Sequence, residues 1–409
     1  MRIKGFITGA LLGLLPLATL QAATQEQPLT DDEFAQCVGR LQTQAREAGL
    51  SEPVVENVLG KVQFNPKIIT YDRRQPEFVQ TFAGYFNARV TENRVMKGRE
   101  LMKEHADLLR EITRKTGVPG RYLLAFWGLE TNFGRYFGKL PVMDSLATLA
   151  CDQRRSDFFS RELLNALRIV DRGDVSAEKM VGSWAGALGH MQFMPSVYLR
   201  YAHDADNDGR RDLWGSLPDA LTSAGYFLKG LGWQPELRWG REVVLPEGFA
   251  YELAGLGDPK PLSFWREKGV KTVFGGPLPQ ADVKAELLVP AGHKGPAFLV
   301  YRNFHVIMGW NQSEFYALSV GVLADRIAGA GRLKHPPPTD TPRLSRATVT
   351  QLQEQLQAAG FDPGPVDGIL GPGTRSAIRS YQAQKGWIAD GFPHPKVLSS
   401  LGIQPKSEE

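Results

Sequence analysis

Cysteine is scarce in this chain of 409 residues, which contains only Cys37 and Cys151. A pair of cysteines without clustered histidines excludes a zinc site of the usual local spacing. In an oxidising compartment the two cysteines could form a disulfide that closes a long loop, whereas otherwise they would be buried free thiols. The sequence leaves both states open.

An excess of charge of either sign is also lacking. The chain has 48 Lys and Arg against 44 Asp and Glu, and without Arg2 and Lys4 of the N-terminal leader the net charge is about +2. This balance excludes the basic footprint of a nucleic-acid-binding protein. The length predicts two or more domains, because a single hydrophobic core rarely grows so large.

Long apolar runs are absent except at the N-terminus. Arg2 and Lys4 precede the apolar run from Phe6 to Leu20, and Leu20-Gln21-Ala22 provides a small-residue cleavage site. This pattern predicts a signal peptide over residues 1–22, because the run is too short to span a membrane comfortably. No cysteine follows the cleavage site, so no lipid anchor is expected; an uncleaved, membrane-tethered form is the alternative.

The remaining pattern predicts a mainly α protein of the α+β class. Apolar residues recur at helical spacing through most of residues 31–330, whereas short runs separated by Gly and Pro indicate a small β subdomain. Proline-rich spacers are semi-rigid and unpacked. The expected units are a main region at 31–330 with the β subdomain at about 240–306, a Pro-rich linker at 331–342, and a helical module at 343–402.

The stretch WGLETNFG places one carboxylate, Glu130, on an apolar helix face. Leu123, Trp127 and Glu130 have the i, i+4, i+7 spacing of one face. Burial and the negative end of the helix dipole both raise the pKa of a carboxyl group. A carboxylic acid that is neutral near pH 7 is what a general acid for glycosidic bond cleavage requires. The alternative is a surface Glu that turns into water or pairs with Arg135.

An acidic loop between residues 204 and 212 predicts a structural calcium site. Its oxygen ligands occupy alternate positions, as in an EF-hand loop, but Gly215 stands where the usual bidentate Glu would be. The alternative is a solvated acidic turn balanced by Arg210 and Arg211. The candidate ligands are Asp204, Asp206, Asp208, the carbonyl of Arg210, and Asp212.

Three motifs in order resemble the lytic murein transglycosylases typified by membrane-bound lytic transglycosylase B. They are WGLETNFG, GSWAGALGHMQFMPS and NFHVIMGWNQSEFYA. In the tail, LQEQLQAAGF, VDGILGPGT and AIRSYQ resemble the type 1 peptidoglycan-binding domain. The resemblance implies a lysozyme-like catalytic core with an extra helical subdomain, a three-helix wall-binding module and a periplasmic location.

The resemblance also implies a reaction. Such enzymes cleave the β-1,4 bond between N-acetylmuramic acid (MurNAc) and N-acetylglucosamine (GlcNAc), and the 6-hydroxyl of MurNAc attacks its own C1 to form a 1,6-anhydro ring. Glu130 falls on the family's catalytic acid, which later acts as the base. Ordinary glycosidases use two carboxylates. No second motif-embedded carboxylate is evident here, which fits a reaction whose nucleophile is the substrate, and no catalytic cofactor is expected.

Substrate contacts are expected from aromatic, amide and hydroxyl side chains. The small residues Gly182, Ser183, Ala185 and Gly186 would let a sugar ring approach the backbone closely. Family members usually carry a hydroxyl residue where Val197 stands and often Tyr at the position of Trp310. For Tyr85 a core position is an equal alternative. The candidates are Tyr85, Ser183, Gln192, Tyr226, Trp310, Asn311 and Tyr316.

The expected partner is the peptidoglycan glycan strand, which the module would hold close to the enzyme. Proteins of wall synthesis or division are further partner candidates, and the chain is expected to be a monomer. Two alternatives remain at this stage. One is a muramidase, in which water attacks C1, and the other is a wall-binding protein without catalytic activity.

Overall fold

The computed structural model describes residues 29–73 and 80–404, and three hydrophobic cores organise them. The largest core joins helices from Phe34 to Ile327. The second fills a sheet region between Val243 and Tyr301, and the third belongs to the C-terminal module. The predicted signal peptide, residues 1–22, lies outside the described residues. No helix of the described residues is long and apolar enough to cross a membrane.

Helices dominate the region around the largest core. The first of them is capped by Thr30, which forms a capping box with Glu33. A short ribbon pairs β1 (Leu140–Pro141) with β2 (Val181–Gly182). The helices are α1 (Asp31–Glu47), α2 (Glu52–Asn57), α3 (Pro66–Arg73), α4 (Phe82–Arg89), α5 (Glu92–Glu104), α6 (Ala106–Thr116), α7 (Gly120–Thr131), α8 (Val142–Cys151), α9 (Ser156–Asp171), α10 (Pro195–Tyr201), α11 (Leu217–Gly230), α13 (Arg302–Trp310) and α14 (Glu314–Ile327).

A disulfide links the two cysteines that the sequence left unassigned. Cys37 of α1 and Cys151 at the end of α8 are bonded, with 5.8 Å between their Cα atoms and 114 residues between them along the chain. The bond ties the first helix to a helix that begins shortly after α7. Disulfides of this kind form and persist in oxidising compartments.

The β subdomain is an antiparallel sheet with strand order β4-β6-β7-β3-β5. The sequence predicted a β subdomain that extends to about residue 306, but its last strand ends at Val300. Phe304 and Ile307 are both buried and three residues apart, which is helical spacing, so α13 begins at Arg302. The strands and helix are β3 (Gly240–Val244), β4 (Gly255–Pro261), α12 (Leu262–Glu267), β5 (Lys271–Thr272), β6 (Lys284–Leu288) and β7 (Ala297–Val300).

The Pro-rich linker is packed against the β subdomain, in contrast to the unpacked spacer expected from its composition. The backbone N–H groups of Lys334 and His335 donate to the carboxylate of Glu242 on β3, at 3.0 and 2.8 Å. Pro337 is buried. Two hydrogen bonds to one carboxylate fix the path of the chain into the module.

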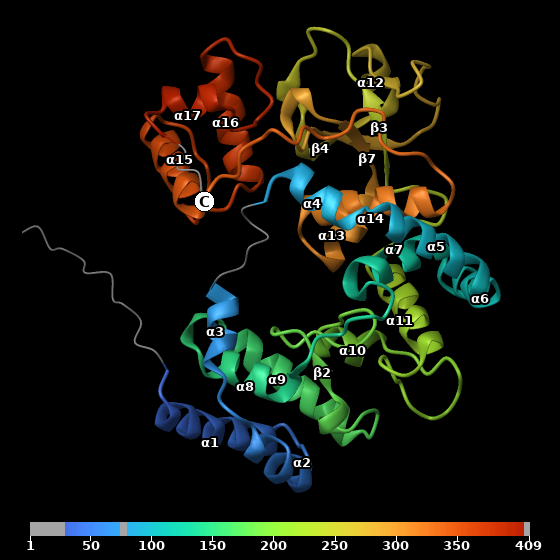
Figure 1. Ribbon diagram of the computed structural model, residues 1–409, viewed down its shortest axis with the longest axis vertical. Coiled ribbons are helices and arrows are strands. Elements are labelled where there is room, and N and C mark those ends of the chain that lie inside the picture. Colours follow the sequence, from blue (N-terminus) through green and yellow to red (C-terminus); the bar gives the residue numbers. More distant parts are fainter. Residues whose placement is uncertain (1–28, 74–79, 405–409) are drawn as a thin grey trace, which may run out of the picture.

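The C-terminal module contains α15 (Arg346–Ala358), α16 (Pro372–Gln384) and α17 (Pro395–Ser400) around a small core. It is docked, because α16 contacts β4. Figure 1 shows the module beside the β subdomain at one end of the molecule, and α1, α2 and α3 with α8 and α9 at the opposite end. The catalytic candidate on α7 lies between these ends.

Candidate active site

Helix α7 carries Glu130 in its last turn and is buried on nearly all sides. Residues from Tyr122 to Gly128 are buried, because α7 packs against both α14 and α5. A helix enclosed in this way needs an apolar sequence all round, as RYLLAFWG provides. Glu130 itself remains partly accessible. The last turn of α7 therefore places one carboxyl group at the edge of the core, where it is partly accessible to solvent.

The chain after Glu130 turns sharply through left-handed backbone. Asn132, Phe133 and Gly134 have φ values of 50°, 60° and 78°. Asn and Gly tolerate this region, whereas a Phe there is strained. The ring of Phe133 packs edge-on against Trp127, with 5.6 Å between ring centroids. This packing holds the strained turn in place directly beyond the candidate acid.

His190 fixes the end of the same helix. Its Nδ1 accepts a hydrogen bond from the indole N–H of Trp127 at 2.9 Å, and its carbonyl oxygen accepts one from the hydroxyl of Thr131, also at 2.9 Å. Burial lowers the pKa of His190 to about 4. The imidazole is therefore neutral at neutral pH, as an acceptor at Nδ1 must be.

Two side chains from the C-terminal part of the main region donate hydrogen bonds to Glu130. The indole N–H of Trp310 on α13 donates to Oε1 of Glu130 at 3.1 Å, and the hydroxyl of Tyr316 on α14 donates to the same oxygen at 2.5 Å. Phe126 packs against Trp310 with 4.3 Å between ring centroids. Residues far apart in the sequence thus converge on one carboxyl oxygen.

The environment keeps Glu130 close to the boundary between its acid and its base form. Burial raises the pKa of Glu130 to about 7, although the hydrogen bonds from Tyr316 and Trp310 and the charge of Arg89 oppose the rise. No carboxylate of the described residues is among the groups that shift this pKa. The predicted rise in the pKa of Glu130 is therefore caused by burial. Arg135, the ion-pair partner in the alternative interpretation, is not among the groups that shift this pKa.

Arg89 and Tyr85 form a cation–π pair beside this centre. The guanidinium carbon of Arg89 lies 3.6 Å from the centroid of the Tyr85 ring. Burial raises the pKa of Tyr316, and the charge of Glu130, its hydrogen bond with Tyr316 and the phenol of Tyr85 add to the rise. Tyr85 is buried, with 4% of its surface exposed. Arg89 was missed by the sequence analysis, since an Arg at the end of a short helix carries no motif signal.

A cavity of about 680 Å³ lies between the main region and the module. Tyr85, Asn311 and Trp184 line it from the main region, and Leu370 and Arg375 line it from the module. Asn311 also accepts a hydrogen bond from the backbone of Ser313 through Oδ1. The module therefore forms part of the wall of a cavity that two of the predicted substrate residues share.

Ser183 and Gln192 stabilise the turns of the second motif. The hydroxyl oxygen of Ser183 accepts from the N–H of Ala187 at 3.1 Å. Gln192 has a φ of 48°, and its side-chain amide donates to the carbonyl oxygens of Phe137 and Gly189. None of these contacts reaches Glu130, so the substrate roles of both residues remain predictions.

Two small residues of the second motif, Gly182 and Gly186, are packed closely against the protein itself. A Cβ atom on Gly182 would lie 2.1 Å from the carbonyl oxygen of Ala187, and one on Gly186 would lie 2.4 Å from the side chain of Leu146. Protein atoms fill the space, so these glycines serve close packing. Ala185 does line the cavity.

Tyr226 lies on α11 and stacks on His203, with 3.7 Å between ring centroids and 6° between ring planes. The ammonium group of Lys229 lies 5.8 Å from the same ring centroid. Neither contact connects Tyr226 to Glu130. Its assignment to the groove remains a prediction.

The acidic loop brings together a different set of carboxylates from the one predicted. Oxygens of Asp204, Asp206 and Asp219 lie within 4.8 Å of one another, and Asp219 comes from α11, beyond the predicted loop. The carboxylate of Asp212 accepts instead from the N–H groups of Trp214 and Gly215.

Another candidate ligand, Asp208, is engaged within the loop itself. The carboxylate of Asp208 accepts from the N–H of Arg210 at 2.8 Å. Sequence spacing could not reveal Asp219, because it lies on the next helix. Three carboxylates in one place fit the oxygen donors that Ca²⁺ prefers.

The lysozyme-like helical body, the carboxyl group of Glu130 with its raised pKa and the docked three-helix module are together the features of a wall-glycan transglycosylase fold. Residues 33–325 match the model of the transglycosylase SLT domain, and residues 345–401 match that of a peptidoglycan binding domain. The chain belongs to the family of SLT-type lytic transglycosylases.

The solved structure of SltB3 from Pseudomonas aeruginosa, in complex with NAG-anhNAM-pentapeptide, is 44% identical to this chain. It matches with a TM-score of 0.87 over 90% of this chain and 99% of that one. Membrane-bound lytic murein transglycosylase B of Escherichia coli (strain K12) is 31% identical over 252 residues, which are 58% of this chain. That alignment spans 65% of the relative's length, just under two thirds.

A third relative was solved together with a metal ion. The Escherichia coli lytic transglycosylase Slt35, solved in complex with calcium, is 25% identical to this chain. It matches with a TM-score of 0.61 over 72% of this chain and 92% of that one. Its similarity thus covers most of the catalytic region.

Proposed function

We propose that this protein is a lytic transglycosylase that cleaves the β-1,4 bond between MurNAc and GlcNAc in peptidoglycan and leaves 1,6-anhydro MurNAc ends. The observation that carries the proposal is Glu130, whose pKa is raised to about 7 and whose carboxyl group is held by Trp310 and Tyr316. The family and the solved complexes of SltB3 with NAG-NAM-pentapeptide and NAG-anhNAM-pentapeptide support it.

In the first step Glu130 acts as an acid. A carboxyl group with a pKa near 7 holds its proton in about half of the molecules at neutral pH and gives it up readily to a glycosidic oxygen. The hydrogen bonds from Trp310 and Tyr316 both use Oε1, which orients the group and leaves Oε2 for the substrate. The C1–O bond breaks as the proton moves from Glu130 to the leaving oxygen of GlcNAc.

In the second step Glu130 acts as a base. The carboxylate formed in the first step is stabilised by the donors Tyr316 and Trp310 and by the positive charge of Arg89. It takes the proton of the 6-hydroxyl as that oxygen bonds to C1 of the same sugar. One carboxyl group suffices in this route, because the substrate supplies the nucleophile.

The module would present the glycan strand to the catalytic region from a fixed position. Its docking through α16, and its share of the cavity wall, support a rigid arrangement more than a flexible tether. The effective concentration of substrate then depends on orientation as well as on proximity.

The acidic loop would hold a structural Ca²⁺. Asp204, Asp206 and Asp219 supply three carboxylates, and the calcium complex of Slt35 supports a cation in this family. The ion would tie the loop to α11 and would take no part in the reaction. The expected location is the periplasm, which the predicted signal peptide and the disulfide support.

A wall-clearing assay tests the proposal. Purified peptidoglycan sacculi should lose turbidity with the wild-type chain and not with Glu130→Gln, whereas Glu111→Gln, an exposed helix position, should match the wild type. Loss of a general acid typically costs about 100- to 10,000-fold in rate. A wild type that binds sacculi without clearing them would instead identify a wall-binding protein.

A further inference from the structure

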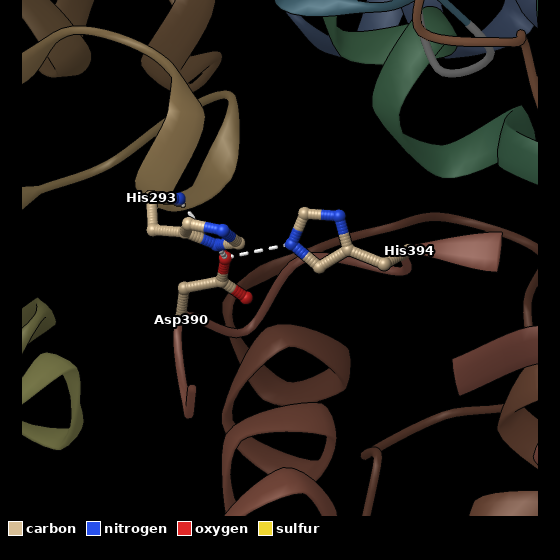
Figure 2. Close-up of side chains that lie close together, drawn as sticks. All are labelled: His293, Asp390 and His394. Atoms are coloured by element: carbon tan, nitrogen blue, oxygen red, sulfur yellow. Dashed lines mark hydrogen bonds and ion pairs between the residues drawn. The ribbon is translucent and has the colours of Figure 1, made fainter. Parts of the chain in front are cut away.

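Two histidines and an aspartate meet at the junction between the β subdomain and the module. His293 lies in a short 3-10 helix, Gly292–Lys294, between β6 and β7, whereas Asp390 and His394 lie between α16 and α17. Figure 2 shows the two imidazole rings converging on the carboxylate of Asp390 from different parts of the fold. The cluster lies outside the residues assigned above to the reaction.

All three side chains meet at one oxygen. Oδ2 of Asp390 lies 2.6 Å from Nδ1 of His293 and 2.7 Å from Nε2 of His394. The backbone N–H of His293 also donates to it, at 2.9 Å. Asp390 is buried, with 2% of its surface exposed, whereas the imidazole side chains are 25% and 21% exposed. Solvent therefore reaches the cluster from the side of the rings.

The module contains a second, matching aspartate that lacks these partners. Oδ1 of Asp367 accepts from the side chain of Gln353 and from a backbone N–H two residues on, and Oδ1 of Asp390 accepts in the same way from Gln382 and from the N–H of Phe392. Among the described residues, no hydrogen bond uses Oδ2 of Asp367. The loop therefore folds through Oδ1 alone, and the two imidazoles on Asp390 are an addition that the module fold does not require.

We propose that His293, Asp390 and His394 form a binding site for a divalent transition metal, zinc foremost, that fastens the module to the β subdomain. Two imidazole nitrogens and one carboxylate oxygen are typical zinc ligands, and three protein ligands leave a fourth tetrahedral position for water. The three ligand atoms lie within 4.8 Å of one another.

The chemistry of the cluster suits this ligand. In the absence of metal, a ring N–H of each imidazole faces Oδ2 of Asp390. When the ion binds, that proton moves to the other ring nitrogen, and the rings swing outward to bonds of about 2.0–2.2 Å around the metal. The bonds from Gln382 and Phe392 to Oδ1 hold the carboxylate in place, as outer partners do in established metal sites.

Sequence spacing could not reveal this site. His293 lies 97 residues before Asp390, so the cluster exists only in the docked state. The exclusion of a zinc site by cysteine count and local spacing therefore covers only ligands close together in the chain. A metal that binds the docked state alone also stabilises docking.

Zinc titration of the untagged mature chain tests the proposal. Calorimetry in buffer with saturating calcium keeps the acidic loop out of the measurement, and elemental analysis gives the stoichiometry. We expect a single zinc ion per chain for the wild type and for His335→Gln, a linker histidine that serves as the control. The double variant His293→Asn, His394→Gln keeps amide donors toward Asp390 and should bind zinc at least about 10-fold more weakly.

Cobalt provides a second measurement that needs no substitution. Co²⁺ added to the wild-type chain should give the intense visible absorption of a tetrahedral site, and zinc should displace it. A wild type that binds no zinc would overturn the proposal, and so would a double variant that retains zinc with wild-type affinity. Neither measurement depends on catalytic activity, so its outcome is separate from that of the proposed function.

Discussion

The hydroxyl of Tyr316 donates a hydrogen bond to Oε1 of Glu130 at 2.5 Å, across 186 residues of sequence. A donor of this kind stabilises the charged carboxylate and so lowers the pKa of Glu130, whereas burial raises it. Together the two effects give Glu130 a pKa of about 7, so both its protonated and its ionised form are present near neutral pH. The same residue can then act in both steps.

Tyr316→Phe should raise the pKa of Glu130, because it removes the donor and leaves burial unopposed by it. Since the acid form starts the reaction, kcat/KM of the wild type should fall as pH rises through about 7. The variant should keep its activity to higher pH, with a lower maximum. The measurement is the pH profile of clearing on sacculi. A falling limb that stays in place would show that this hydrogen bond does not set the pKa.

Glu130→Gln should stabilise the fold at alkaline pH. The pKa of Glu130 is higher in the folded chain than its ordinary value of 4.5, so the folded state binds the proton more tightly. That contribution to stability is present below pH 4.5 and is lost as pH rises through about 7. The thermal midpoint of the variant should therefore exceed that of the wild type by more at pH 8 than at pH 4. Equal differences at both pH values would argue against a raised pKa.

Loss of the Cys37–Cys151 disulfide should destabilise the fold. The bond closes a loop of 114 residues, and removing such a bond costs about 2–5 kcal/mol. Denaturant unfolding of Cys37→Ser, Cys151→Ser should show a midpoint lower than that of the oxidised wild type. Reductant should lower the wild-type midpoint and leave the double variant unchanged. A wild type insensitive to reductant under unfolding conditions would mean that the bond is absent.

Calcium should stabilise the chain through the acidic loop. Its addition should raise the thermal midpoint of the wild type, because it binds the folded state. Asp219→Asn should abolish most of this rise, whereas Asp212→Asn should retain more of it, since Asp212 binds backbone N–H groups and lies outside the acidic group. An equal loss in both variants would favour the ligand set expected from the sequence.

Local signals predicted much of the fold. Apolar spacing placed α7 and its end near Glu130, and composition indicated the β subdomain and the helical module. The same signals failed where a contact decided the structure. The β subdomain was expected to extend to about residue 306, yet Phe304 and Ile307 pack as part of a helix. The linker was expected to be unpacked, yet its backbone N–H groups bind Glu242.

The site was predictable to the extent that motifs carried it. Glu130, Trp310 and Tyr316 could be named from the sequence, because each stands in a recognisable stretch. Arg89 and Asp219 could not, since a lone Arg or Asp on a helix has no distinguishing neighbours and acquires its role only when the helices pack. Gly182 and Gly186 also stand in a recognisable motif, but the motif did not reveal that their small size serves packing against Ala187 and Leu146.

The most direct test of the account is mass spectrometry of the fragments that the wild-type chain releases from purified sacculi. If Glu130 takes a proton from the 6-hydroxyl of MurNAc in the second step, the new ends should be 1,6-anhydro MurNAc. Such an end is lighter by one water than a reducing end. Fragments that end in reducing MurNAc would show that water attacks C1, and the protein would then be a muramidase.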